Sequence, residues 1–96
     1  MFNKNSILKL NKYILQRFEH NLNEGTIILY NTNTQTVWFG NVSAYLLIKL
    51  IDGKKTLETI YKEFENLYED YTPQEIKESI NAIIKELIDK QFLENL

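Results

Sequence analysis

The feature that most constrains the fold of this chain is a helix-forming segment that is apolar on nearly every side. The segment Val42–Ile51 reads VSAYLLIKLI, in which only Ser43 and Lys49 are polar, and Asn41 before it is a good N-cap. A helix that is apolar all round has to be covered on most of its surface. In a chain of 96 residues, the other elements must therefore pack around this helix as one domain.

The segments before this helix are typical of β-strands. Lys12–His20, Thr26–Tyr30 and Gln35–Gly40 are rich in β-branched and aromatic residues, and short stretches containing Asn and Gly separate them. Gly25 can supply the positive φ that the first turn requires. The order predicts three successive antiparallel strands joined by short turns.

The segments after this helix are typical of two more helices. Asp52-Gly53 ends the apolar helix, with Gly53 suited to a left-handed C-terminal cap, and Thr56 is an N-cap. The following apolar residues recur at helical spacing and form one stripe: Leu57, Ile60, Tyr61, Phe64 and Tyr68. We expect this second helix to bury that stripe.

The last helix has the clearest start in the chain. Thr72 is its N-cap, Pro73 occupies the first helical position and Glu75 completes a capping box. We assign the core stripe to Ile76, Ile80, Ile83 and Leu87, with Ile84 and Ile88 widening it to one side. The residues QFLENL at the end of the chain are expected to be extended.

These elements predict an α+β fold of order β-β-β-α-α-α. We expect a three-stranded antiparallel sheet packed on a three-helix, winged-helix-like core. Residues 1–11 are expected to form a flexible, basic N-terminal arm, and residues 12–96 a single domain.

Composition narrows the environment and the chemistry. The chain has no cysteine, so it has no disulfide and no thiol nucleophile. Its longest apolar run falls far short of the roughly 18 residues that a membrane span needs, and no signal peptide is apparent. We therefore expect a cytoplasmic protein that does not contact a membrane.

Taken together, the order and spacing of these motifs resemble the PqqD-like family, also called the RiPP recognition element. The matching pattern is a strand hairpin, then GNVSAYLLIKLIDGKKTLETIYKEFENLY, then a third helix and a QFL tail. The residues that fit best are Asn41, Ala44, Asp52-Gly53, Thr56, Ile60 and Tyr68. Two positions depart from the family pattern: Gly40 replaces an apolar residue, and Gln91 replaces the glycine that usually ends the last helix.

The resemblance implies a non-catalytic adaptor without a cofactor. Family members bind the leader segment of a ribosomally made precursor peptide and present it to a separate maturation enzyme, such as a radical SAM enzyme, a cyclase or a peptidase. The leader adds as a further strand beside the third strand, in the groove between that strand and the last helix. Carried over to this chain, the implied peptide-binding residues are Gln35, Thr36, Val37, Trp38, Phe39, Lys77, Asn81, Ile84 and Lys85.

The third strand supports this use on physical grounds. Gln35–Phe39 contains neither charge nor proline, the residues with which natural proteins blunt a free sheet edge. Both faces of the strand carry large apolar groups, because Trp38 points to one side and Val37 and Phe39 to the other. Either the chain covers both faces of the sheet, or one face packs on the core while the other lines a groove for a peptide.

The last helix would form the opposite wall of that groove. We place Lys77, Asn81, Ile84 and Lys85 on its groove-facing flank, where Ile84 could receive an apolar anchor and a lysine could meet a carboxylate. A solvated flank with pairs of charges four residues apart is the alternative for the lysines.

Other classes of function fit less well. The last helix carries a net charge of −1, which argues against a winged-helix domain that binds nucleic acid. His20 is the only histidine and lies at a strand end, and no phosphate loop, metal cluster or catalytic pair is recognisable, so we do not expect an enzyme. The remaining alternative is a homodimer in which Gln35–Phe39 pairs with the same segment of a second copy.

Overall fold

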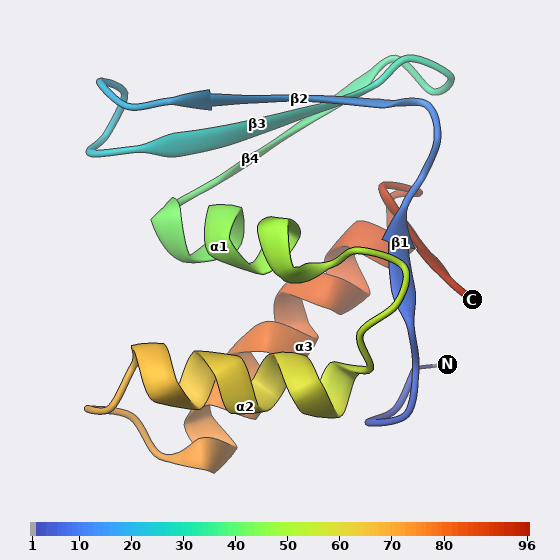
Figure 1. Ribbon diagram of the computed structural model, residues 1–96. Coiled ribbons are helices and arrows are strands. Elements are labelled where there is room, and N and C mark those ends of the chain that lie inside the picture. The colour runs from blue at the N-terminus through green and yellow to red at the C-terminus, as the bar shows by residue number, and fades with distance from the viewer. Residues whose placement is uncertain (1) are drawn as a thin grey trace.

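The computed structural model describes residues 2–96 and shows three layers (Figure 1). An antiparallel sheet forms the upper layer in this view, helix α1 lies beneath it, and helices α2 and α3 form the lowest layer. The elements are β1 (Leu8–Leu10), β2 (Ile14–Glu19), β3 (Thr26–Asn31), β4 (Thr36–Gly40), α1 (Val42–Leu50), α2 (Leu57–Leu67), α3 (Pro73–Asp89) and β5 (Leu93–Asn95). The predicted α+β class and the β-β-β-α-α-α order of the main elements are confirmed.

The main sheet has the strand order β2-β3-β4, with both pairs antiparallel. Ile27 and Leu29 of β3 are almost fully buried, and Leu29 pairs with Trp38 of β4. Successive side chains of a strand point to opposite faces, so Trp38 shares the inner face with Leu29, while Val37 and Phe39 lie on the outer face. Only the inner face is covered by helices (Figure 1).

Helix α1 begins where the sequence predicts it. The Asn41 side chain accepts a hydrogen bond from the Ala44 N–H at 3.0 Å. Ala44, Leu47 and Ile48 of this helix are buried. The helix itself lies between the sheet and the two lower helices (Figure 1). The cover is not complete, because Val42 at the start of the helix is exposed. The helix therefore forms the central layer of the molecule.

Helices α2 and α3 also start at their predicted caps. The Thr56 hydroxyl accepts a hydrogen bond from the Thr59 N–H at 3.3 Å. Thr72 and Glu75 form a reciprocal capping box, with bonds of 3.1 and 3.0 Å. The stripe expected for α2 is buried at Leu57, Ile60, Tyr61 and Phe64, and Tyr68 is half-buried.

The two ends of the chain form a second sheet that the sequence did not suggest. Strand β1 pairs antiparallel with β5, so that Leu8 lies opposite Asn95 and Leu10 opposite Leu93. Residues 1–11 were expected to form an arm outside the domain, but Leu8 is 1% exposed and belongs to the core. The hydrogen bond from the Gly53 N–H to the Leu8 carbonyl, at 3.0 Å, also ties this strand to the end of α1.

The structure explains the first departure from the family pattern. A Cβ on Gly40 would lie 2.6 Å from the Ala44 Cβ and from two ring carbons of Trp38. The missing side chain therefore lets the Trp38 indole lie close to the first turn of α1.

The second departure is a backbone in the left-handed region. Gln91 has a φ of 66° directly after α3, and its carbonyl accepts a hydrogen bond from the Asn31 side chain at 2.9 Å. A non-glycine residue in this conformation costs roughly 1–2 kcal/mol. The helix ends here as the family pattern implies, but with a residue that is strained there.

None of the helices in the described part of the chain has the length and hydrophobicity that a membrane crossing requires.

The close contact at Gly40 leads to a stability prediction. We expect Gly40→Ala to lower the free energy of unfolding by about 1–3 kcal/mol, because the added methyl group overpacks against Trp38 and Ala44. Urea denaturation measures this change, with Thr36→Ala, an exposed position of the same strand, expected to change stability by less than about 0.5 kcal/mol. An equally small change in the free energy of unfolding for both substitutions would contradict the close packing of Gly40 against Trp38 and Ala44.

The strain at Gln91 leads to a second prediction of opposite sign. We expect Gln91→Gly to raise the free energy of unfolding by about 1 kcal/mol, because glycine adopts a positive φ without a steric cost. Glycine in the middle of a helix, as in Ala82→Gly at an exposed position of α3, should instead lower it by about 1 kcal/mol. The two melting temperatures, measured against the unchanged protein, should therefore move in opposite directions.

Candidate functional site

The open edge of β4 is the first component of the site. Within residues 2–96, β4 pairs with β3 on one side and with no strand on the other. The opposite edge strand, β2, carries the ion pair Arg17–Glu19, whereas Thr36–Gly40 has no charged residue. An edge that lacks charge and proline is suited to pairing with a further strand.

The two faces of β4 differ sharply in exposure. Trp38 is half-buried and packs against the core, whereas Val37 is 49% and Phe39 61% exposed. On the same outer face, Leu15 of β2 is 63% exposed. The explanation in which the chain itself covers both faces of the sheet is therefore wrong. The outer face around Phe39 is open.

Trp38 connects the inner face of β4 to α3. Its indole N–H donates a hydrogen bond to Oε1 of Glu86 at 3.0 Å, and Nζ of Lys90 lies 3.5 Å from the same oxygen. The Trp38 hydrogen bond is the main reason why the pKa of Glu86 lies below its ordinary value, with the positive charge of Lys90 adding to it. The ionised carboxylate thus holds the tryptophan in place between strand and helix.

A hollow lies on the side of this contact where β4 begins. It has a volume of about 380 Å³, and its walls come from the start of β4 and from the end of α3: Thr34, Thr36, Val37, Asp89, Lys90, Gln91 and Phe92. The expected site residues Thr36 and Val37 therefore border this hollow together with the C-terminal end of α3. Gln35 directly precedes this stretch, is exposed and has a positive φ of 59°.

The residues expected on the flank of α3 lie elsewhere. Ile84 is fully buried in the core, so it is not accessible to a peptide, whereas Ile83, which we assigned to the core, is only partly buried. Asn81 accepts a hydrogen bond from the Tyr61 hydroxyl of α2, and Nζ of Lys77 lies 5.8 Å from the centre of the Tyr61 ring. These two residues therefore point toward α2, away from β4.

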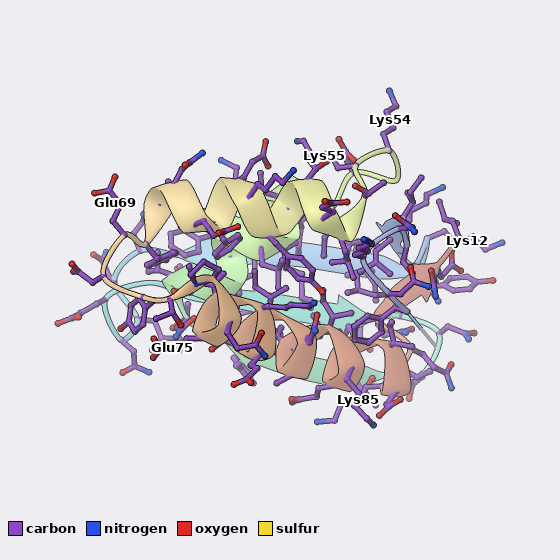
Figure 2. All side chains as sticks on the ribbon, turned by 90° about the horizontal axis from the view of Figure 1, so that it is seen from below. Lys12, Lys54, Lys55, Glu69, Glu75 and Lys85 are labelled. Atoms are coloured by element: carbon purple, nitrogen blue, oxygen red, sulfur yellow. The ribbon has the colours of Figure 1, made fainter. Side chains whose placement is uncertain are left out.

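Lys85 also lies outside the groove. Its Nζ pairs with Asp89 at 3.0 Å, and both side chains are exposed. Figure 2 shows Lys85 at the outer margin of α3. This is the solvated charge pair that we considered as the alternative for the lysines. The flank of α3 that meets β4 instead carries Glu86 and Lys90, which the sequence did not single out.

Helical periodicity alone could not have identified the flank of α3 that carries Glu86 and Lys90 as the one beside β4. That assignment also requires the position of β4. Ile83, Glu86 and Lys90 are three and four residues apart, so they lie on one side of α3. Lys77 and Asn81 share the other side by the same rule. The periodicity identifies both flanks but does not tell which neighbour each one faces.

No group of three or more His, Asp or Glu side chains within residues 2–96 is arranged to hold a metal ion. His20 packs edge-on against the Phe18 ring, with 4.7 Å between the ring centres. This aromatic contact lies on the surface, where β2 ends and near the start of β3.

In a comparison with protein-family models, residues 26–93 match a model described as Coenzyme PQQ synthesis protein D (PqqD). The match begins with β3 and includes β4, all three helices and the first residue of β5, which is more than half of the chain. No curated protein and no solved structure matches the chain.

The bond between Trp38 and Glu86 leads to a prediction on pH. Because the pKa of Glu86 is lowered in the folded protein, the stabilising effect of its carboxylate is present above the ordinary value of 4.5 and is lost as the pH falls through the lowered value. Trp38 is the only tryptophan, so its fluorescence reports this step directly. We expect a fluorescence transition with a midpoint below pH 4.5 that is absent from Glu86→Gln.

Far-UV circular dichroism over the same pH range is the control for general unfolding. A transition of the same amplitude and midpoint in Glu86→Gln would show that another group controls the environment of Trp38.

Proposed function

Because the chain belongs to the PqqD family, we propose that it is a non-catalytic adaptor that binds the leader segment of a ribosomally synthesised precursor peptide. It would then present the peptide to a separate modifying enzyme. The family is one of accessory proteins for the biosynthesis of peptide-derived products, and this supports the general role. The mode of binding proposed here is strand addition to the outer edge of β4.

The open, uncharged edge of β4 is the observation that supports strand addition most directly. It is free of other strands within residues 2–96, it has no charge, and the segment 8–10 that could have covered it pairs with β5 instead. In strand addition, backbone hydrogen bonds provide affinity and alternate side chains provide specificity. A peptide beside β4 would place every second side chain toward Trp38 and α3.

The polar groups along the α3 wall fit this mode. Glu86 and Lys90 supply one charge of each sign beside Trp38, and Asp89 and Thr36 border the hollow at the start of β4. These groups can accept both acidic and basic side chains of a guest strand.

Two other functions have less support. A DNA-binding role would require a basic surface on α3, but the side that meets β4 carries Glu86 and Asp89 beside Lys90. A homodimer in which β4 pairs with β4 of a second copy would use the same edge. The exposed Val37 and Phe39 side chains would then lie beside those of the second copy. The two modes predict opposite responses to an added peptide.

The direct test is a titration with peptides encoded by short reading frames next to the gene, followed by Trp38 fluorescence. We expect saturable binding with a Kd of roughly micromolar or lower, which corresponds to about 8 kcal/mol. Val37→Pro should abolish binding, because proline removes an N–H from the edge and bends the strand. Gln16→Pro, on the opposite edge strand, should leave the affinity unchanged in a folded protein, because alternation along the strand points its N–H outward rather than toward β3.

Two results would contradict peptide binding at the β4 edge, and one of them concerns the oligomeric state. A dimer that persists at saturating peptide concentration, or equal affinities of folded Val37→Pro and the unchanged protein, would place the guest elsewhere.

A further inference from the structure

A second cavity lies at the junction of the three helices. It has a volume of about 300 Å³. Its floor consists of buried apolar side chains from all three helices: Leu47, Phe64, Ile76 and Ile80. Its rim is formed by partly or fully exposed residues, among them Ser43, Tyr68, Tyr71, Ser79 and Ile83. No residue of β4 lines this cavity, so it is separate from the strand edge.

The cavity nevertheless borders the end of that edge. Asn41, which follows the last residue of β4, lies on its rim, and Ile83 lies one turn of α3 before Glu86. A strand advances about 3.3 Å per residue. A peptide that runs along β4 and continues past Gly40 therefore reaches the mouth of the cavity roughly 10 Å, or three residues, beyond Trp38.

The lining selects a neutral guest. Most polar groups on the rim already have partners within the protein: Asn41 caps α1, Glu75 belongs to the capping box of α3, and the Ser43 and Tyr68 hydroxyls lie 2.8 Å apart. Figure 2 shows Glu75 beside the start of α3, where its carboxylate is committed to the helix terminus. No basic side chain lines the cavity, and its floor is apolar.

We propose that this cavity is an anchor site for one large, neutral, apolar or phenolic side chain of the guest peptide, located beyond the part that pairs with β4. This inference rests on the proposed function, because it assigns the side chain to the same peptide. The chemistry of one apolar side chain is shared by free small molecules, so the test separates the two sources.

The first experiment examines the cavity without any peptide. The ¹⁵N-labelled full chain is titrated with N-acetyl-leucine methylamide and with p-cresol, which represent aliphatic and phenolic side chains. We expect saturable shifts of the Ser43, Tyr68 and Ile83 amide signals. Ser79→Phe fills the cavity from its exposed rim and should remove the shifts.

The matched control is Glu78→Phe, which adds the same ring to the neighbouring exposed position outside the cavity. It should leave the shifts intact. Tyr71→Ala, which removes an exposed ring of the rim, provides a second variant in case Ser79→Phe does not fold. The absence of saturable shifts, or equal shifts in Ser79→Phe, would overturn the proposal.

The second experiment uses a neighbouring-gene peptide that binds the unchanged protein. We expect Ser79→Phe to weaken its binding roughly 10- to 100-fold, the loss that corresponds to burial of one large apolar side chain, and Glu78→Phe to leave it unchanged. If Ser79→Phe binds the peptide normally while Val37→Pro does not, the adaptor function stands and the anchor site is refuted. Fragment binding combined with normal peptide affinity would assign the cavity to a free small molecule.

Discussion

The burial of α1 is the constraint on which the rest of the structure depends. Leu47 is fully buried, and the helix needs the sheet on one side and α2 and α3 on the other to be covered. All three helices therefore lie on one side of the sheet, so its outer face and the edge of β4 stay open. The same arrangement brings α3 beside β4, where Glu86 meets Trp38. The open edge of β4 beside α3, to which we propose that a strand adds, is thus a consequence of how the apolar helix is buried.

The two hollows lie near the two ends of β4. One hollow lies at the start of β4 against the end of α3, and the other lies beyond Gly40 among the three helices. Trp38 lies between these two ends in the strand, and its indole is held by the Glu86 carboxylate and packs close to Gly40. A guest strand that we propose to pair with β4 would contact both hollows only if its side chains extended on both sides of the Trp38 indole.

Much of the fold could be predicted because its signals are local. The caps Asn41, Thr56 and the Thr72–Glu75 box each depend on residues at most three positions apart, and all are confirmed. The β1–β5 sheet could not be predicted, since its strands are three residues long and pair the two ends of the chain. The flank of α3 was assigned wrongly for a related reason. Local periodicity gives the core stripe, whereas the neighbour of each flank depends on tertiary packing, which placed Ile84 in the core and Lys77 and Asn81 against α2.

The central claim is that a peptide pairs with the outer edge of β4. Amide hydrogen exchange, measured with and without saturating peptide, tests it most directly, because unpaired amides at a free edge exchange quickly and become protected when a strand is added. The account predicts new protection within residues 36–40 and no change in the edge strand at residues 14–19. Protection of residues 14–19, with residues 36–40 unchanged, would contradict it.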